Sequence, residues 1–238
     1  YILDSILNPY LKNISMISHV YDKNYRQLKT NKNNVHICAS ITNAYIYPIL
    51  VSMESVLFNC NKEKTFLTYH ILCSSDFTEK NLLILQSLTK KYSSNSEMIF
   101  YNMSDLFMNR YIKRFSQATY YRILSPCIID VDRIIYLDAD TLVLKDLSDM
   151  YNTELNDNYV LGTLDYIAHG IDSLGIKSEK FINGGVLLLN LDKIRKNNKV
   201  YDLINIAYNG TSLLCNDQSI INYVFYPKIG ILPHKFRI

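Results

Sequence analysis

The stretch RIIYLDADTLV, residues 133–143, places two acidic side chains directly after an apolar run. Such a run is typical of a strand that is buried on both faces, as in a parallel sheet covered by helices. Asp138 and Asp140 then fall where the strand ends, at the edge where open α/β sheets bind their ligands. The stretch therefore predicts an α/β fold with a polar site at the carboxyl end of a central strand.

Neighbouring segments show the same alternation of strand and helix. Strands are predicted at 65–73 (TFLTYHILC) and 97–103 (EMIFYNM). Between them, FTEKNLLILQSLTKKY (77–92) predicts an amphipathic helix with Thr78 as its N-cap. ATYYRILSPCII (118–129) predicts a helix that continues as far as its proline. We expect a mostly parallel central sheet flanked by helices.

The start of the chain differs from this regular pattern. LKTNKNN, residues 28–34, is polar and turn-prone, and the alternation begins only after it. We expect residues 1–34 to form an N-terminal extension that is helical, and residues 35–238 to form one α/β domain.

The composition excludes several kinds of partner. The formal net charge of +3 is small and the basic residues are scattered, which argues against nucleic-acid binding. No apolar run approaches the roughly 20 residues that cross a bilayer, so no membrane span is expected. The five cysteines are far apart and form no C-x-x-C pair, which is typical of free thiols in a reducing compartment. We therefore expect a cytoplasmic location.

The paired acids predict a cation site. In an extended chain, side chains with one residue between them point to the same side, so Asp138 and Asp140 could reach one ion. Mg²⁺ and Mn²⁺ prefer oxygen ligands, and Mg²⁺ commonly takes one or two carboxylates together with substrate phosphates. An Asp at a strand end can equally cap the following turn, and the motif alone does not decide between these alternatives.

One enzyme class with this string is the haloacid-dehalogenase-type phosphatases. In those enzymes D-x-D-x-T after a strand supplies a nucleophilic Asp, here Asp138, and an acid/base Asp, here Asp140. They also carry a G-D-x-x-x-D type motif further along the chain, and none follows residue 140. Their D-x-D-x-T motif usually stands near the start of the chain, whereas this one lies past the middle.

A second family matches at six places in order. The stretches are NVHICASITNAYIYPILVSMESVL, SQATYYRILSP, VDRIIYLDADTLVLKDLSDMYNTEL, FINGGVLLLNLDKIR, CNDQSIIN and ILPHKF. On them the sequence resembles the family 8 retaining glycosyltransferases of the GT-A fold, the group of bacterial lipopolysaccharide galactosyl- and glucosyltransferases and glycogenin. The resemblance implies a GT-A domain over residues 35–238. It also implies transfer of glucose or galactose from UDP-glucose or UDP-galactose to a saccharide or glycoconjugate acceptor, with the anomeric configuration kept.

The resemblance implies a metal site that is incomplete in this sequence. Asp138 and Asp140 would hold Mn²⁺ or Mg²⁺ against the donor diphosphate, and Ala139 between them would also contact the donor. The family's third ligand is a His in a late H-x-x-G-x-x-K-P-W segment, and the sequence reaches Ile238 before any such segment. His234 does not match that ligand. We expect this C-terminal segment to be absent.

Several residues match family positions around the donor sugar. Arg122 in ATYYR would lie near the sugar, where its planar fork suits phosphate and hydroxyl oxygens. Asp165 and Asn183 would bind sugar hydroxyls. Gly184 and Gly185 would let the backbone pass close to the ligand, although a plain strand bend would also use glycine. The alternative for Arg122 is a helix-surface position.

The NDQ segment carries the expected catalytic residues. Asp217 would bind a sugar hydroxyl, and Gln218 matches the residue on the far face of the anomeric carbon. An amide is a poor nucleophile, so we favour substitution on the front face, with the leaving diphosphate helping to deprotonate the acceptor. The alternative is an Asp-Gln pair at a helix start, with Asn216 as the cap.

The expected nucleotide pocket departs from the family pattern. Relatives commonly carry an acidic residue that accepts the uracil N–H, and the matching position is Thr42. The Thr42 hydroxyl or the amide of the neighbouring Asn43 would then contact the nucleotide in its place. Ser40 would contact the nucleotide through its backbone. The missing acid and the missing C-terminal motif keep open a degenerate nucleotide-sugar-binding domain without turnover.

Overall fold

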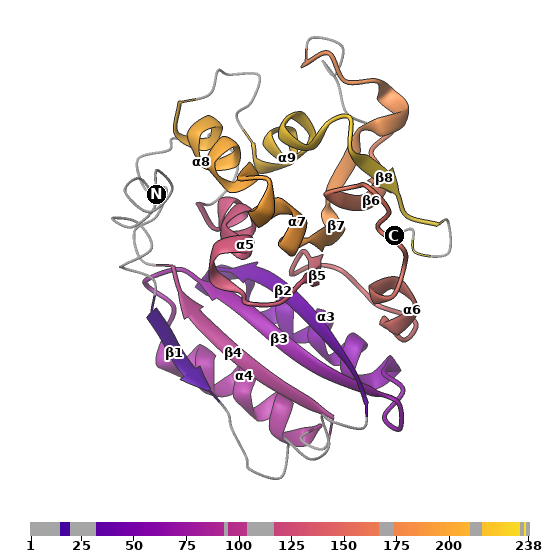
Figure 1. Cartoon of the computed structure of the whole chain (residues 1–238). Helices are drawn as coiled ribbons and strands as arrows, with labels where there is room; N and C mark the ends of the chain where they lie inside the picture. Colours follow the sequence, from indigo (N-terminus) through magenta and orange to yellow (C-terminus); the bar gives the residue numbers. More distant parts are fainter. Residues whose placement is uncertain are drawn as a thin grey trace.

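The computed structural model describes residues 15–19, 32–92, 95–103, 117–166, 174–209, 216–233 and 236. In this part of the chain, eight strands form one sheet in the order β1-β4-β3-β2-β5-β7-β6-β8 (Figure 1). The strands are β1 (Ser15–His19), β2 (Asn33–Ile41), β3 (Thr65–Cys73), β4 (Ser96–Asn102), β5 (Arg133–Leu137), β6 (Val160–Leu164), β7 (Ile182–Asn190) and β8 (Ile229–Ile231). The central strands β4, β3, β2 and β5 run parallel, as expected, while β7 runs antiparallel to both of its neighbours.

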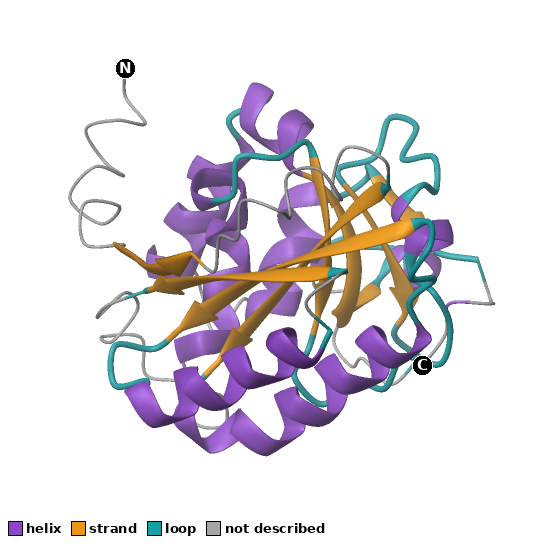
Figure 2. Cartoon of the chain, turned by 90° about the horizontal axis from the view of Figure 1, so that it is seen from below, coloured by secondary structure: helices purple, strands orange, loops and turns teal. Residues whose placement is uncertain are grey.

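Helices cover both faces of the sheet (Figure 2). The helical elements are η1 (Asn43–Tyr45), α3 (Ile46–Asn59), α4 (Glu79–Lys91), η2 (Gln117–Leu124), α5 (Ser125–Ile128), α6 (Ser148–Tyr151), η4 (Ser178–Lys180), α7 (Leu191–Lys196), α8 (Lys199–Asn209) and α9 (Asp217–Phe225). One core cluster joins a face of the sheet to α3, α4 and α6, and another joins the opposite face to η2, α5, α7, α8 and α9.

Strand β5 shows why the sheet needs both layers. Ile135 and Leu137 pack into the cluster with α3 and α4, while Ile134 and Tyr136 pack into the opposite cluster. This alternation follows from the two-residue period of a strand. The prediction of a buried strand ending at the acidic pair is confirmed, as are the strands at β3 and β4. Helix α4 begins as predicted, because the Thr78 hydroxyl accepts a hydrogen bond from the Asn81 N–H.

The structure differs from the predicted elements at three places. Within residues 1–34, where a helical extension was expected, the described residues Ser15–His19 form a strand that pairs antiparallel with β4. Strand β2 begins at Asn33, inside the expected extension of residues 1–34. The predicted helix ending at Pro126 is instead a 3-10 helix followed by α5, and Pro126 lies in the first turn of α5. A proline suits that turn because its missing N–H would have no partner there.

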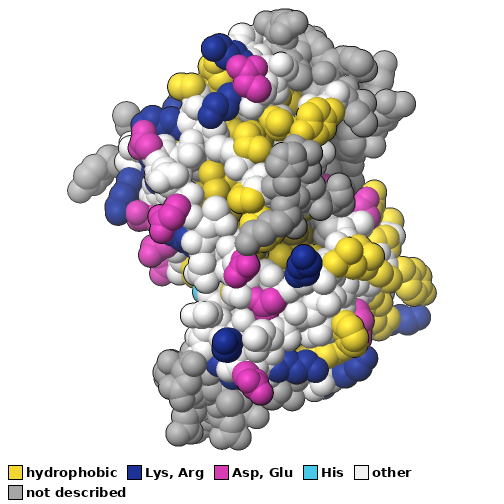
Figure 3. All heavy atoms as spheres, turned by 90° about the vertical axis from the view of Figure 1, so that its right-hand side faces the viewer, with side chains coloured by type: hydrophobic (Ala, Val, Ile, Leu, Met, Phe, Trp, Pro, Cys, Tyr) yellow, Lys and Arg dark blue, Asp and Glu magenta, His cyan; other side chains and the backbone are white. Residues whose placement is uncertain are grey.

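Helix α3 presents apolar side chains to solvent as well as to the core. Tyr47, Val51 and Phe58 are exposed, and Leu142 and Leu144 lie exposed in the loop after the acidic pair. Figure 3 shows hydrophobic side chains gathered on the surface in patches between charged ones. No helix among the described residues is long and apolar enough to span a membrane.

Candidate active site

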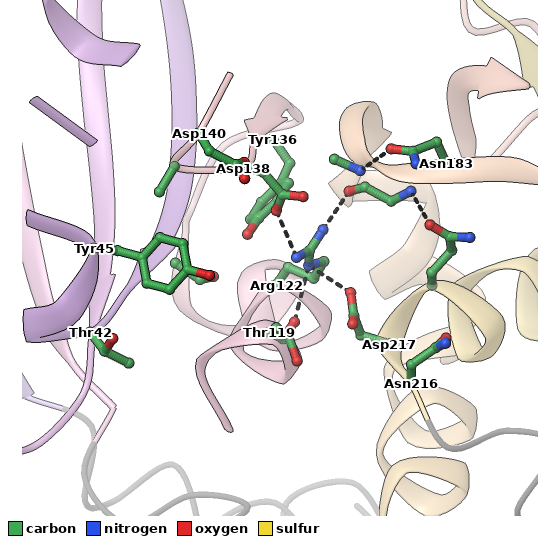
Figure 4. A pocket seen from close by; sticks show the side chains of 15 residues that line it. Thr42, Tyr45, Thr119, Arg122, Tyr136, Asp138, Asp140, Asn183, Asn216 and Asp217 are labelled. Atoms are coloured by element: carbon green, nitrogen blue, oxygen red, sulfur yellow. Dashed lines mark hydrogen bonds and ion pairs between the residues drawn. The ribbon is translucent and has the colours of Figure 1, made fainter. Parts of the chain in front are cut away.

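A cleft of about 350 Å³ opens at the carboxyl ends of β2 and β5, beside the start of β7 and of α9 (Figure 4). Its lining residues are Ser40, Thr42, Tyr45, Thr119, Arg122, Tyr136, Asp138, Ala139, Asp140, Asn183, Gly184, Gly185, Asn216, Asp217 and Gln218. The structure thus brings together all the predicted site residues except Asn43 and Asp165. The lining residues come from five separate parts of the chain.

The acidic pair lies in a turn rather than in extended chain. Strand β5 ends at Leu137, and the Thr141 N–H donates to the Asp138 carbonyl at 3.2 Å, closing a turn over the two residues between them. The expectation that an extended backbone aligns the two carboxylates is therefore wrong. Both Asp138 and Asp140 nevertheless line the cleft, because the turn follows the strand end directly.

Arg122 is buried at the base of the cleft and connects three elements (Figure 4). Its Nη2 donates to Asp138 Oδ1 at 2.8 Å, and its Nε lies 2.8 Å from Asp217 Oδ2. Its Nη1 donates to the Gly184 carbonyl. The guanidinium also stacks over the Tyr136 ring, 4.2 Å from the ring centre. The side chain therefore joins the end of β5, the start of β7 and the first turn of α9.

Burial and neighbouring charges shift the pKa values of Arg122 and Asp217 in opposite directions. Burial alone would lower the pKa of Arg122, but the carboxylates of Asp217 and Asp138 raise that pKa above its usual range. Burial raises the pKa of Asp217, and the charge of Arg122 opposes that rise. Arg122 is only 5% exposed, so the alternative of a helix-surface position is wrong.

Both ends of the Gln218 carboxamide are bound within the protein. Its Oε1 accepts from the Gly184 N–H at 2.9 Å, and its Nε2 donates to Asp165 Oδ2 at 2.8 Å. Asp165 thus acts on the cleft through Gln218 instead of lining it. Asn216 caps α9, since its side chain accepts from the Ser219 N–H at 2.7 Å, so Asp217 and Gln218 do occupy the first turn of a helix.

Gly185 allows β7 to pass close to the acidic pair. A Cβ atom at this position would lie 2.8 Å from Asp138 Oδ2 and 3.1 Å from Asn183 Oδ1. The Gly185 N–H also donates to Asn183 Oδ1 at 2.8 Å, which holds the Asn183 side chain at the cleft. The second glycine of the FINGG segment therefore makes room for Asp138.

Asn43 points away from the cleft, toward the start of α4. Its Nδ2 donates to the Asp76 carbonyl at 2.5 Å, and its Oδ1 accepts from the Thr78 N–H at 3.0 Å. Asn81 Nδ2 donates to the same oxygen at 2.9 Å. The side chain links η1 to the N-terminus of α4. In this arrangement it is turned away from the cleft and does not make the contact with the nucleotide sugar that was expected for Asn43.

Several residues line the cleft without having been predicted. They are Tyr45, Thr119, Tyr136 and Asn216. For two of them, the spacing from a predicted site residue could have indicated that they line the cleft. Tyr136 lies two residues before Asp138, which is the period of a strand, and Thr119 lies three before Arg122, which is one turn of a 3-10 helix.

The acidic pair fits a divalent cation with few protein ligands. Among the described residues, no three or more His, Cys, Asp or Glu side chains come together as a complete metal site. Mg²⁺ commonly takes one or two carboxylates and fills its other positions with water and phosphate oxygens. Asp138 Oδ2 accepts no hydrogen bond from a described residue, and Asp140 is exposed in the cleft. Asp138 and Asp140 therefore suit Mn²⁺ or Mg²⁺ in the presence of a phosphate-bearing ligand.

Comparison with known proteins gives consistent matches over most of the chain. The model of the family described as glycosyl transferase family 8 matches residues 17–238. The lipopolysaccharide 1,2-glucosyltransferase of Escherichia coli is 25% identical over 243 residues, covering 95% of this chain and 69% of that protein. Glycosyltransferase GlyB of Streptococcus pneumoniae is 24% identical over 210 residues, covering 86% of this chain and 48% of that protein. The chain thus spans only part of these curated relatives.

Solved structures show the same fold. The galactosyltransferase LgtC, in complex with donor and acceptor sugar analogues, superposes with a TM-score of 0.71 at 23% identity, covering 85% of this chain and 74% of that one. The bifunctional glycosyltransferase WbbM superposes with a TM-score of 0.72 at 20% identity, covering 91% of this chain and 40% of that one. The predicted GT-A type of α/β fold is therefore confirmed.

Proposed function

The chain belongs to glycosyl transferase family 8, and from this premise we propose that it transfers glucose or galactose from a UDP-sugar to a saccharide acceptor, with retention of configuration. Membership in a transferase family sets aside the phosphatase interpretation of the D-x-D-x-T string. The observation that carries the proposal is the single cleft in which Asp138 and Asp140 face the starts of β7 and α9.

The cleft has the chemistry that a nucleoside-diphosphate sugar requires. Asp138 and Asp140 would hold Mn²⁺ or Mg²⁺. When bound, this ion would neutralise the negative charge that grows on the diphosphate as its bond to the sugar breaks. Asn183 and Asp217 offer an amide and a carboxylate to sugar hydroxyls. Glucose and galactose are proposed as the transferred sugars because one similar protein is named a glucosyltransferase and another a galactosyltransferase.

The contacts of Gln218 favour direct substitution on one face of the sugar. A double displacement would need a nucleophile on the far face, and an amide is a poor one. Here both ends of that amide are bound, to Gly184 and to Asp165. In the proposed reaction the anomeric carbon–phosphate oxygen bond breaks, the acceptor oxygen bonds to the same face, and its proton passes to the departing diphosphate. Gln218 would hold the backbone of β7 in place throughout.

A donor screen tests the proposal. The chain is incubated with Mn²⁺ or Mg²⁺ and each of UDP-glucose, UDP-galactose and other nucleotide sugars, and released UDP is measured. We expect release with a UDP-hexose, in the presence of metal, and calorimetric binding of UDP that needs Mn²⁺. Binding without turnover, also with added saccharide acceptors, would instead support the degenerate nucleotide-sugar-binding domain. Absence of both binding and release would refute the proposal.

A further inference from the structure

The start of β7 is bound by side chains as well as by its neighbouring strands. The ladder of β5 with β7 ends at Leu137 with Val186, and one further backbone bond runs from the Asp138 N–H to the Gly185 carbonyl at 2.8 Å. On the other side, the ladder with β6 jumps from Leu187 to Ile182, so residues 183–186 have no partner there. The backbone of this segment forms one wall of the cleft, and its hydrogen bonds must be satisfied by other groups.

At the residue before this segment, the Asn222 side chain of α9 binds both backbone groups of Ile182. Its Oδ1 accepts from the Ile182 N–H at 2.8 Å, and its Nδ2 donates to the Ile182 carbonyl at 2.8 Å. The same Nδ2 donates to the Gln218 carbonyl at 2.9 Å. Asn222 is 0% exposed, so each of these bonds is made away from bulk water. The carboxamide occupies both backbone groups of Ile182, as a paired strand would.

Asn222 and Gln218 act on alternate residues of the same strand. They lie four residues apart on α9, so they share one face of the helix. Asn222 holds Ile182 and Gln218 holds the Gly184 N–H, while Arg122 holds the Gly184 carbonyl. The residue between, Asn183, lines the cleft.

We infer that Asn222 is a positioning residue that fixes the register of α9 against β7 and thereby places Asn183 and Gln218 in the cleft. Asn222 itself does not line the cleft, and it acts through its bonds to Ile182 and to the Gln218 backbone. The part of the inference that concerns activity depends on the proposed function. The structural part does not.

Two variants of similar size separate hydrogen bonding from packing. Asn222→Leu removes all three bonds, and Asn222→Asp keeps an acceptor for the Ile182 N–H but places a carboxylate against two carbonyls. A displacement of catalytic groups by about 1 Å can reduce turnover about 100-fold, so we expect kcat to fall 10- to 100-fold, roughly, in both. Asn222→Ser, which leaves space for a bridging water, is measured as well in case the larger changes prevent folding.

Asn95→Leu is the matched control for lost stability. Asn95 is also a buried asparagine whose amide donates to two backbone carbonyls, those of Lys62 and Thr65. These bonds lie at the amino ends of β3 and β4, whereas the cleft lies at the carboxyl ends of the parallel strands. We expect this variant to lower the melting temperature while kcat of the folded protein stays unchanged.

A double-mutant cycle with Gln218→Ala tests whether Asn222 acts through Gln218. If Asn222 positions Gln218, its replacement should reduce kcat much less in the Gln218→Ala background than in the wild type. Equal fold-losses in the two backgrounds would contradict the inference. So would an Asn222 variant that folds and keeps the wild-type kcat.

Amide hydrogen exchange measured by NMR tests the inference without any reaction. In folded Asn222 variants the Ile182 and Gly184 amides should both lose protection, because the helix no longer holds the strand at either residue. Asn95→Leu should leave both protected. If only Ile182 loses protection, Asn222 forms a local bond and the inference fails. A wild-type chain without transferase activity would refute the proposed function, and this measurement would still decide the role of Asn222.

Discussion

The two acids of the D-x-D motif make different contacts, so their replacement should have separable effects. Asp140 is exposed in the cleft, whereas Asp138 is ion-paired to the buried Arg122. We expect Asp140→Asn to reduce metal-dependent UDP binding and sugar transfer about 100-fold with little change in stability, because it removes only a proposed metal ligand. Asp138→Asn should cause a similar loss and also lower the melting temperature. Calorimetry and thermal unfolding measure both quantities.

An Asp140→Asn variant that binds UDP and Mn²⁺ as the wild type does would contradict the assigned metal site. Glu63→Gln is a suitable control, because this exposed carboxylate lies in the turn before β3 and outside the cleft. It should change neither binding nor melting temperature.

Arg122 should matter to stability as much as to chemistry. Arg122→Ala leaves Asp217 buried without its counter-charge, and breaking a buried ion pair on one side costs about 3–5 kcal/mol. Adding Asp217→Asn to that variant removes the unpaired charge and should restore part of the free energy of unfolding. Urea unfolding of the wild type, both single variants and the double variant measures the coupling. A double variant no more stable than Arg122→Ala would contradict this account.

The pH dependence of Arg122→Ala provides a second measurement. Burial raises the pKa of Asp217, and loss of Arg122 removes the main opposing charge. The folded state then binds a proton more readily than the unfolded state, so its stability is greatest below the unfolded pKa and falls as pH rises through the folded pKa. We expect the destabilisation by Arg122→Ala to be larger at about pH 8 than at about pH 5. The opposite trend would contradict the role given to Asp217.

At the scale of elements, local sequence signals predicted some features and not others. The period-two and helical patterns predicted β3, β4, β5 and α4, because each pattern lies within its own segment. Strand β1 was missed because it is stabilised by pairing with β4, far along the chain. The turn at the acidic pair was missed because it is closed by bonds from Thr141 to the Asp138 carbonyl, which the alternation of a strand does not foretell.

The cysteines of the sheet and its helices should be chemically inert in the folded protein. Burial raises the pKa of Cys60, Cys73 and Cys127 to about 12 in each case. At about pH 8 only roughly one thiol in ten thousand would then be the reactive thiolate. We expect negligible alkylation of these three residues by iodoacetamide until urea unfolds the chain, as measured by peptide mass spectrometry. Rapid labelling of the folded protein would show that their surroundings open easily.

At the scale of the whole molecule, the sequence predicted which residues meet but not how they are joined. The residues of the cleft could be placed together because family motifs and strand ends identify one edge of the sheet. The bond from Arg122 to Gly184 crosses 62 positions and the Asp165–Gln218 bond crosses 53. Such contacts depend on the exact register of β7 against its neighbours, which no local pattern encodes. The sequence therefore predicted Arg122 as a ligand contact, and the structure shows each of its three guanidinium nitrogens donating to a protein group.

The single sheet shared by two core layers should make the described domain unfold as one unit. Leu187 and Leu188 are adjacent on β7 and fully buried, but they pack into opposite clusters. Each Leu→Ala change should cost about 2–5 kcal/mol, and each should lower the stability of both layers because neither layer can keep its face of the sheet alone. Hydrogen exchange of peptides from α4 and α8, on opposite faces, measures this. We expect both peptides to lose protection equally in both variants, while Leu83→Ala, at an exposed position on α4, should change neither. Loss confined to α8 in Leu187→Ala would show instead that the two layers unfold independently.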